Sequence, residues 1–434
     1  MSDGIIARKI AHEVLTEVLN KKLPLDQVID KHAGFNSLDS RDRGLVFLLI
    51  ATVLRRRGQC DSLIKTLQNK IDQKLNDSIQ NVLRIGLTQL LFLDIPHHAA
   101  VDTTVALCDA LDLSGFKTFV NAVLRRTIRE REILTKNLRN VRLNLPEWLF
   151  ARLSADWGEE AALEIGRASL NEAPLDLTIK EAQKVQLYIF QLEGNHLFGN
   201  TLRLDERVPV AQTKGFSEGD WWVQDASAAL PAALLGDVSG KIIYDICAAP
   251  GGKTAQLASA GAKVTALDRS GNRQKRLAEN MSRLKLTQNV DIVIDDATTW
   301  VPPEPADIVL LDAPCSSTGI IRRHPDILYL KSEDDIANLV DVQKRLLDNA
   351  AKMVKPGGIL MYCTCSIFKI EGEEQVASFL ENHPEFQSVD FEPREVGGHS
   401  EFINEHGQIR LFPTHMAEKG GMDGFFIARL KKTA

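Results

Sequence analysis

Cysteine is scarce in this chain, and the cysteines present do not form a disulfide framework. Six of them are spread over 434 residues, at Cys60, Cys108, Cys247, Cys315, Cys363 and Cys365. Small secreted domains that depend on disulfides carry many more cysteines per residue. We therefore expect free thiols and a reducing, cytoplasmic compartment.

Long hydrophobic runs are also lacking. The longest, residues 44–54, lies between Arg43 and Arg55. It is far shorter than the ~20 apolar residues that a membrane-spanning helix needs. The opening segment MSDGIIARKI has no apolar core of signal-peptide type. We expect no membrane partner.

The sequence has too few grouped ligands to indicate a metal. Cys363 and Cys365 form a lone C-x-C pair, and no second pair stands at a suitable spacing. Because zinc takes about four protein ligands in structural sites, we expect no metal.

Charge is unevenly distributed along the chain. Lys and Arg number 52 against 58 Asp and Glu, a formal net charge of −6. The first 145 residues have a balance of +6, and the remainder has −12. This asymmetry indicates a basic front that meets a polyanion, although drift in composition between two domains explains it equally well.

The front of the chain, residues 1–145, has the apolar periodicity of helices. We expect helices over 41–55, 79–93, 99–111 and 116–131, the first of them buried, and an all-α domain. Basic residues cluster in it. These residues either lie at solvated helix ends or contact phosphate groups. Their clustering favours phosphate contacts, which position RNA without reading its sequence. The candidate RNA-binding residues are Arg55, Arg56, Arg84 and Arg125.

The pattern changes after Leu145. Residues 146–234 indicate a connecting module of mixed α and β structure, with strand-like character at 174–179 and 185–190. We interpret the paired Trp221 and Trp222 as buried aromatics. From 235 to 434, apolar strands alternate with helices, which predicts βαβ units, a parallel sheet and helices on both of its faces.

A glycine-containing loop follows the first strand of this region and opens a helix. It reads DICAAPGGKT from Asp245 to Thr254. It has neither the first glycine of a P-loop nor a G-x-G-x-x-G fingerprint, which disfavours ATP and NAD. Asp268 ends the second strand, where an acid can accept hydrogen bonds from ribose hydroxyls, and Asp295 and Asp296 follow the third. Together they indicate an adenosyl ligand without a triphosphate, such as S-adenosylmethionine.

Two cysteine loops follow later strands. Asp312-Ala-Pro-Cys315 ends one apolar strand, and Thr364-Cys365-Ser366 ends another. Ligands bind at the carboxyl ends of parallel strands, so both loops should open on one rim of the sheet. This placement predicts a thiol beside a carboxylate, a combination suited to covalent catalysis. The alternative for any one cysteine is a small buried hydrophobe.

These motifs carry a resemblance that runs essentially end to end. Segments 245–254, 312–319, 322–326 and 364–366 resemble the RNA 5-methylcytosine methyltransferases. The segments RIGLTQLL, from Arg84, and VNAVLR, from Val120, are similar to the NusB-like RNA-binding domain. The resemblance implies a NusB-like all-α domain at 1–145, an RNA-recognition module at 146–234 and a Rossmann-like α/β methyltransferase domain at 235–434. The implied cofactor is S-adenosylmethionine, and the implied substrate is a cytosine of small-subunit ribosomal RNA.

The resemblance also implies a role for each motif residue. Cys365 would attack C6 of the cytosine, Cys315 would serve proton loss and product release, and Asp312 would bond the ring N3 and exocyclic amine. Arg322, Arg323 and His324 would contact phosphates around the target base. Asp268 would bind the ribose, Asp296 the adenine side, and Asp312 would also border the cofactor. The methionine end would be held by Cys247, Ala248, Ala249, Pro250, Gly251, Gly252 and Lys253.

Spacing alone leaves alternatives open. It does not decide whether Cys365 or Cys315 attacks. A non-catalytic RNA-binding or antitermination factor with a methyltransferase fold is the rival function, but it would be expected to lack Asp312, Cys315 or Cys365. An amino-methyltransferase would carry an [N/D/S]-P-P-[Y/F] loop in place of residues 312–315. We expect a monomer, since one chain suffices for this architecture.

Overall fold

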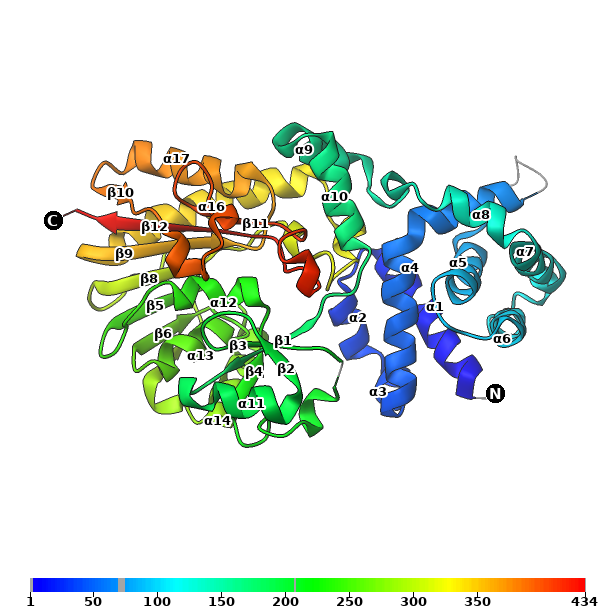
Figure 1. Cartoon of the computed structure of the whole chain (residues 1–434), viewed down its shortest axis with the longest axis horizontal. Helices are drawn as coiled ribbons and strands as arrows, with labels where there is room; N and C mark the ends of the chain where they lie inside the picture. The colour runs from blue at the N-terminus through cyan, green and yellow to red at the C-terminus, as the bar shows by residue number, and fades with distance from the viewer. Residues whose placement is uncertain (1–2, 69–74, 207, 434) are drawn as a thin grey trace. The chain divides into compact units, whose positions relative to one another are not determined.

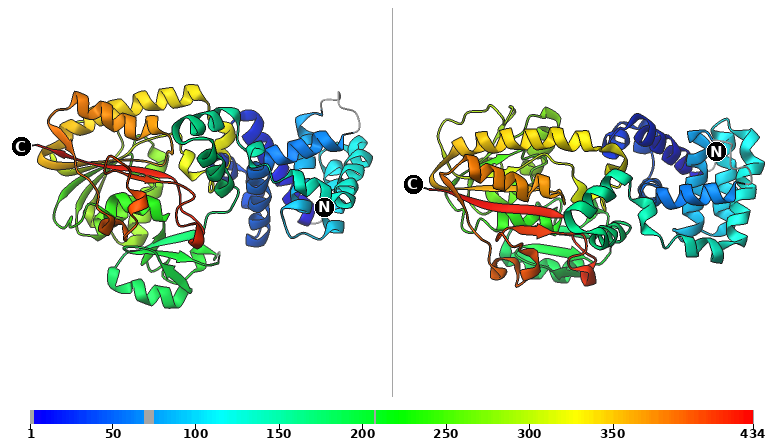
Figure 2. Two further views of the ribbon diagram at one scale, coloured as in Figure 1. Left: turned by 45° about the horizontal axis from the view of Figure 1, so that its top comes forward. Right: turned by 90° about the horizontal axis from the view of Figure 1, so that it is seen from above.

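The computed structural model describes residues 3–68, 75–206 and 208–433. The chain divides into two compact units. The first comprises Met1–Asn171 with Ile321–Ser332, and the second comprises Glu172–Ile320 with Glu333–Ala434. Figures 1 and 2 show that the first unit is helical and that the second contains the large sheet.

The helical unit has one apolar core, to which α1, α4, α5, α6 and α7 contribute. The predicted buried helix is α4, and its side chains from Leu49 to Leu54 are almost wholly buried. Asp39 begins it by accepting a hydrogen bond from the Asp42 amide at 2.8 Å, as N-cap residues do. The helices are α1 (Asp3–Lys21), α2 (Leu25–Lys31), α3 (Ala33–Asn36), α4 (Ser40–Leu67), α5 (Asp77–Leu91), α6 (His97–Ala110), α7 (Lys117–Arg129) and α8 (Arg131–Asn137).

Two later helices, α9 (Glu147–Trp157) and α10 (Glu159–Ser169), also group with this unit. The turn before them is joined to α4, because the Asn144 side chain accepts a hydrogen bond from the Gln59 amide at 3.0 Å. Gly58 permits this approach, since a Cβ there would collide with the Leu143 carbonyl. In this part of the chain the division into units falls at residue 171, and the domain boundaries at 145 and 234 stay predictions.

A segment distant in sequence completes the helical unit. Residues 321–332, with α15 (Ile327–Leu330), follow the first cysteine loop along the chain. Asp326 accepts a hydrogen bond from the first amide of α2, Leu25 N, at 2.9 Å. The Tyr329 hydroxyl donates to the Leu54 carbonyl at 2.9 Å, and the Arg57 guanidinium lies over the Tyr329 ring.

The second unit is built on an eight-stranded sheet in the order β10-β12-β9-β8-β5-β6-β7, with β11 paired to β12. The five strands from β9 to β7 in this order are parallel, as predicted, whereas β10, β11 and β12 run antiparallel to their neighbours. The strands are β5 (Ile242–Ile246), β6 (Lys263–Leu267), β7 (Val290–Val293), β8 (Ala306–Asp312), β9 (Val354–Thr364), β10 (Phe386–Ser388), β11 (Ile409–Leu411) and β12 (Phe425–Lys432).

Helices cover both faces of this sheet (Figure 1). Successive strand residues point to opposite faces, so Ile308 and Leu310 pack in one core while Val309 and Leu311 pack in the other. The first core includes side chains of α12 (Ala226–Ala233), α13 (Gly252–Ser259) and α14 (Gly271–Leu284). The second includes side chains of α16 (Glu333–Met353) and α17 (Glu373–Asn382).

A smaller antiparallel sheet precedes the large one, in the order β2-β3-β1-β4. Its strands are β1 (Leu175–Ile179), β2 (Gly194–His196), β3 (Thr201–Leu204) and β4 (Trp221–Val223). The strand predicted at 185–190 is wrong, because this segment lies in helix α11 (Val185–Leu192). Its residues Val185, Tyr188, Ile189 and Leu192 pack on the small sheet at helical spacing, a pattern that a short, nearly continuous apolar run conceals.

Candidate active site

The carboxyl ends of β5, β8 and β9 form one wall of a pocket in the second unit. Asp312 at the end of β8 is in register with Cys363 of β9, so the segments that follow both strands start at the same rim, as predicted. The pocket has a volume of about 440 Å³, within the range of small-molecule sites. Its walls include Gln224, Asp225, Asp245, Asp312, Cys365 and Phe425.

The glycine-containing loop forms the floor of this pocket. Residues 248–253 all line it, whereas Cys247, also predicted to bind cofactor, is not among the lining residues. Gly251 begins α13 with a φ of 101°, a backbone conformation that favours glycine. A Cβ at Gly251 would lie 2.9 Å from Leu277 Cγ of α14. Gly251 therefore allows both the turn and the close packing of the loop on α14.

Asp245 is a site residue that the motif contained but that was given no role. It is fully buried at the end of β5, and Thr254 Oγ1 donates a hydrogen bond to its Oδ2 at 2.6 Å. Its Oδ1 is buried without a hydrogen-bond partner among the residues that the structure describes. Burial raises the pKa of this carboxyl to about 7. A buried acceptor facing the pocket fits a ligand that carries a hydrogen-bond donor.

The two acids predicted for the nucleoside lie outside the residues that line the pocket. Asp268 is buried, accepts a hydrogen bond from the Ala249 amide at 3.3 Å and pairs with Arg273 at 3.1 Å. It thus adjoins the glycine-containing loop. Asp296 is exposed, and hydrogen bonds from the Thr298 amide and hydroxyl lower its pKa. Their nucleoside roles stay predictions.

The two cysteine loops bring their thiols together. Cys315 Sγ and Cys365 Sγ are 3.4 Å apart. Cys365 lines the pocket, whereas Cys315 is buried and is not among the lining residues. The hydrogen bond to Cys365, together with burial, raises the pKa of Cys315 well above its ordinary value. Cys315 is therefore a thiol, and Cys365 is the sulfur that an incoming base can reach.

Asp312 connects a third thiol, that of Cys363, to a buried cation. Lys253 Nζ donates to Asp312 Oδ2 at 2.8 Å, and Cys363 Sγ lies 3.6 Å from Asp312 Oδ1. Burial is the largest single influence and opposes the charge of Lys253, but Asp312, Cys363 and Asp245 together raise the pKa of the ammonium. The Phe425 ring lies 5.2 Å from the same Nζ. The site thus presents an anion and a cation beside the accessible thiol.

Sequence reasoning missed the contribution of the segment that follows β4. Gln224 and Asp225 line the pocket, and so does the predicted buried aromatic Trp222. Asp225 begins α12 by accepting a hydrogen bond from the Ser227 amide at 2.8 Å. The side-chain oxygen Oε1 of Gln224 accepts hydrogen bonds from the Thr178 hydroxyl and the Trp222 indole N–H at 2.9 and 2.7 Å. The paired tryptophans mark this segment in the sequence, but nothing in the pattern shows that it reaches the site.

The basic residues predicted to bind RNA have different environments in the helical unit. Arg55, Arg84 and Arg322 are only 4%, 4% and 1% exposed. The Arg55 guanidinium donates to the Arg322 carbonyl at 2.6 Å, and Arg84 forms a two-bonded ion pair with Asp61. These three arginines contribute to packing, because burial removes them from any surface that RNA could touch.

The other four predicted RNA-binding residues are more accessible. Arg125 is exposed, and Arg56, Arg323 and His324 are half-buried. His324 Nδ1 lies 3.7 Å from the Asp26 carboxylate. Within the described ranges 3–68, 75–206 and 208–433, no group of three or more His, Cys, Asp or Glu side chains is arranged to hold a metal. No helix within these ranges is long and apolar enough to cross a membrane.

Fold and site together define the chain as a methyltransferase of the Rossmann-like, S-adenosylmethionine-dependent class. The family model of the 16S rRNA methyltransferases RsmB/F matches residues 232–431, and the NusB family model matches residues 5–129. Ribosomal RNA small subunit methyltransferase B of Xylella fastidiosa (strain Temecula1) is 36% identical, over 100% of this chain and 99% of its own. The protein of that name from Cronobacter sakazakii is 34% identical over the full length of both chains. The chain belongs to this family of ribosomal RNA small subunit methyltransferases.

Solved structures agree with this assignment. The superposition with the structure of PH0851 covers 98% of this chain and 99% of the PH0851 chain, with a TM-score of 0.75 and 25% identity. A methyltransferase homologue from Pyrococcus horikoshii covers 65% of this chain and 93% of its own, with a TM-score of 0.54 and 27% identity. The predicted fold class, enzyme class and cofactor are confirmed at the level of the family.

Proposed function

We propose that this chain transfers a methyl group from S-adenosylmethionine to C5 of a cytosine in small-subunit ribosomal RNA, through a covalent bond between Cys365 and C6. One observation carries the proposal: Cys365, Asp312 and the glycine-containing loop line the same pocket. The names of the relatives that match the chain from end to end supply the substrate class.

The residues of the pocket fit the cofactor. The loop 248–252 offers its backbone, and Asp245 offers a buried acceptor that has no partner among the described residues. Asp268 is the proposed partner of the ribose hydroxyls, Asp296 is the proposed partner on the adenine side, and Cys247 belongs to the turn of the loop. When bound, S-adenosylmethionine supplies the methyl group that C5 of the base receives.

The protein's own groups prepare the base for this transfer. C5 of cytosine is a poor nucleophile until a thiolate adds to C6, which turns the ring into an enamine-like adduct. Cys365 first loses its thiol proton to solvent. As its thiolate bonds to C6, the C5=C6 electron pair moves into the ring and negative charge develops at N3. The Lys253 ammonium, paired with Asp312 in the same pocket, stabilises that charge, and the Asp312 carboxylate accepts a hydrogen bond from the exocyclic amine.

Product release reverses the addition. After methylation, the C5 proton must leave and the bond between Cys365 and C6 must break, so that the ring regains its double bond and the sulfur regains its electron pair. We assign proton loss and release to Cys315, which lies 3.4 Å from the attacking sulfur. In this proposal Cys315 first gives its thiol proton to solvent, and the resulting thiolate accepts the proton from C5 while the C5–H electron pair forms the C5=C6 double bond and releases Cys365.

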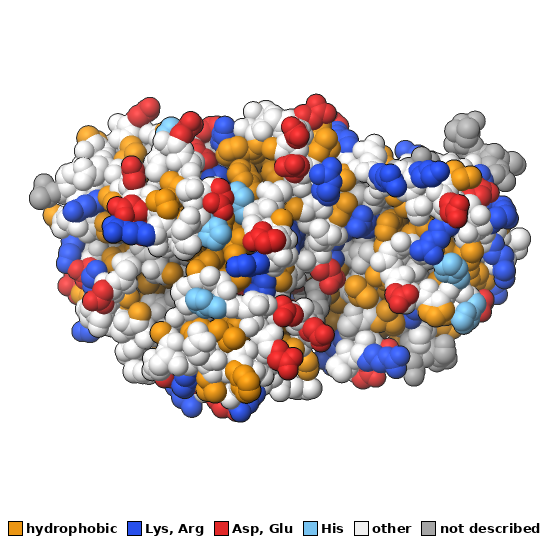
Figure 3. Space-filling model, viewed as in Figure 1, with side chains coloured by type: hydrophobic (Ala, Val, Ile, Leu, Met, Phe, Trp, Pro, Cys, Tyr) orange, Lys and Arg blue, Asp and Glu red, His pale blue; other side chains and the backbone are white. Residues whose placement is uncertain are grey.

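The helical unit is the part of the chain proposed to bind the RNA. On the face drawn in Figure 3, blue Lys and Arg side chains lie over α7 and α8, interspersed with acidic ones. Arg125 and Arg129 of α7 and Arg131 of α8 are exposed. We propose phosphate contacts for Arg125 and also for Arg56, Arg323 and His324. The target base must leave its stack to reach the pocket, which costs a few kcal/mol unless it lies in a loop.

We further propose that the protein acts as a monomer in the cytoplasm.

The test measures transfer of labelled methyl groups to small-subunit ribosomal RNA, free and in the particle, followed by nucleoside analysis. We expect 5-methylcytosine. With RNA containing 5-fluorocytosine, the wild-type protein and Cys108→Ala, a buried cysteine of α6, should form a covalent adduct, and Cys365→Ala should form none. Cys315→Ala should accumulate an adduct on unmodified RNA. Methylated adenine, no product from either substrate, or trapping lost only in Cys315→Ala would overturn the proposal.

A further inference from the structure

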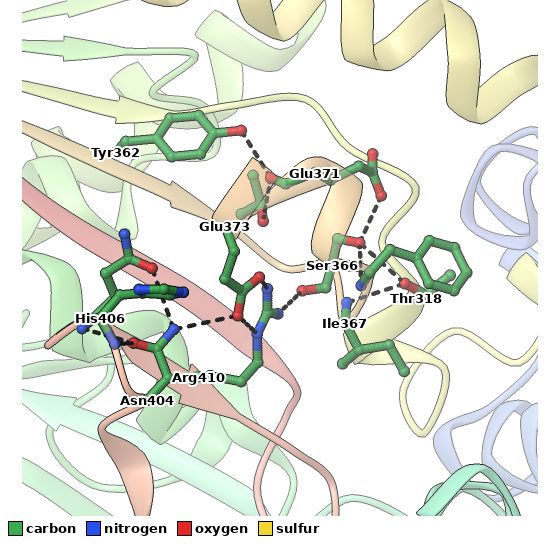
Figure 4. A network of polar contacts seen from close by, with 12 residues as sticks. Thr318, Tyr362, Ser366, Ile367, Glu371, Glu373, Asn404, His406 and Arg410 are labelled. Carbon is green, nitrogen blue, oxygen red and sulfur yellow. Dashed lines mark hydrogen bonds and ion pairs between the residues drawn. The ribbon is translucent and has the colours of Figure 1, made fainter. Parts of the chain in front are cut away.

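A buried carboxylate that lies outside the pocket hydrogen-bonds to both cysteine loops. Glu371, at the end of the short 3-10 helix Lys369–Glu371, is fully buried and does not line the pocket. Ser316 directly follows Cys315, and Ser366 directly follows Cys365. Both serines hydrogen-bond to this one carboxylate. Figure 4 shows the Glu371 side chain directed at Ser366.

Each oxygen of the Glu371 carboxylate accepts two hydrogen bonds. Oε1 accepts from the Ser316 amide at 2.8 Å and from Gln343 Nε2 of α16 at 3.0 Å. Oε2 accepts from the hydroxyls of Ser316 and Ser366 at 2.5 and 2.6 Å. Four donors therefore converge on one side chain, and three of them belong to residues next to the two active-site cysteines. Buried polar networks that are fully satisfied fix a unique geometry.

The backbone around Glu371 adds to this connection. Its carbonyl accepts a hydrogen bond from the Tyr362 hydroxyl at 2.9 Å, and Tyr362 lies in β9 just before the second cysteine loop (Figure 4). The serine hydroxyls also contact each other at 3.2 Å, and Thr318 Oγ1 lies within 3.3 Å of both. The loops thus share one polar cluster in which Glu371 is the acidic member.

An ion pair also contacts the Cys365 loop. Arg410 donates to the Ser366 carbonyl at 2.6 Å and pairs with Glu373 at 2.5 Å (Figure 4). Glu371 differs in its position, because its carboxylate accepts hydrogen bonds from both loops, through Ser316 and Ser366. Its contacts can therefore set the separation between the two sulfurs.

We propose that Glu371 is a positioning residue that holds Cys315 and Cys365 at the spacing that attack and release require. The proposal rests on the function assigned above to these cysteines. Glu371 acts through Ser316 and Ser366, without touching the base or the cofactor. Its removal should therefore change the rate of the reaction while leaving cofactor affinity unchanged.

Three variants separate this role from a general loss of fold. In Glu371→Gln, the amide oxygen can accept from the Ser316 amide and Gln343, while the two serine hydroxyls turn to accept from the amide nitrogen, so the loops stay joined. Glu371→Ala removes the connection. Glu374→Gln, on the exposed face of α17, is the matched control.

We expect Glu371→Ala to slow single-turnover methyl transfer at least about 100-fold, the effect of misplacing reacting groups by about 1 Å. Glu371→Gln should retain the rate to within about 10-fold, and the control should match the wild type. The dissociation constant for S-adenosylmethionine, measured by calorimetry, should change no more than about 2-fold in any of them. Unchanged transfer in Glu371→Ala, or a loss of cofactor binding as large as the loss of rate, would overturn the proposal.

A separate measurement tests the distance between the sulfurs of Cys315 and Cys365. The oxidant diamide joins the two thiols in a disulfide, taking one proton and one electron from each, and the product is counted as the cross-linked Cys315–Cys365 peptide by mass spectrometry. We expect cross-linking to slow at least about 10-fold in Glu371→Ala and little in Glu371→Gln. Equal rates in all variants would refute the positioning role. Because this readout needs no RNA, it remains decisive even if Cys365 proves not to be the attacking residue.

Discussion

Replacing Asp245 by Asn should alter how the stability of the protein depends on pH. The carboxyl is fully buried, has one hydrogen bond at 2.6 Å from Thr254, and has a pKa raised by burial from 3.8 to about 7. A group that holds its proton more tightly when folded contributes stability that is complete below about pH 4 and is lost as the pH rises to about 7. This rise in pKa corresponds to about 4 kcal/mol of unfolding free energy. Asn carries no such titration.

The wild type should therefore lose about 3 kcal/mol of unfolding free energy between pH 5 and pH 8 that Asp245→Asn does not lose. The difference between the variant and the wild type should change by this amount, in favour of the variant. Urea unfolding at pH 5, 6, 7 and 8, followed by tryptophan fluorescence, measures this difference. Hydrogen exchange in peptides that cover β5 identifies the transition of the α/β unit. Asp291→Asn, at an exposed position of β7, is the matched control and should show no such trend. A constant difference between Asp245→Asn and wild type would show that Asp245 titrates near its ordinary value and would refute the reasoning.

Three further substitutions test other parts of the structure. Lys253→Met removes the cation 2.8 Å from Asp312 and should slow single-turnover methyl transfer about 100-fold; an unchanged rate would exclude the pair from the reaction. Arg203→Met leaves the carboxylate of Asp176, which is 0% exposed, without its ion-pair partner. It should cost about 3–5 kcal/mol in urea unfolding, whereas the exposed Arg125→Met should stay within about 0.5 kcal/mol of wild type. Tyr329→Phe loses the 2.9 Å hydrogen bond to the Leu54 carbonyl and should cost about 1 kcal/mol; no change would mean that water replaces this bond without loss.

Much of the fold could be predicted because it depends on local pattern. The helical periodicity of the front and the alternation of strands and helices after residue 235 both correspond to observed elements. The segment 321–332 could not be placed in this way. Its position in the helical unit depends on contacts such as that between Asp326 and Leu25, which join residues about 300 positions apart. No periodicity encodes such a pairing.

The site was predictable where a strand end fixes it. The motifs around Asp312 and Cys365 meet at one rim because β8 and β9 are parallel neighbours. Glu371 was not predictable, because an acid six residues beyond a cysteine is ordinarily a surface residue. Its four hydrogen-bond donors come from three separate segments, and only the folded chain shows that they converge.

The basic clusters do not show which arginines reach solvent, for a geometric reason. An α-helix turns by about 100° per residue, so consecutive arginines such as Arg55, Arg56 and Arg57 cannot all face solvent. Arg55 is buried, and the other two lie over the rings of Phe92 and Tyr329. Residues four positions apart do share a face, and Arg125 and Arg129 are both exposed on α7, while Arg126 between them is half-buried. For solvent-exposed arginines on a helix, the informative signal is thus the spacing of the arginines rather than their local number, and in α7 this spacing identifies Arg125 and Arg129.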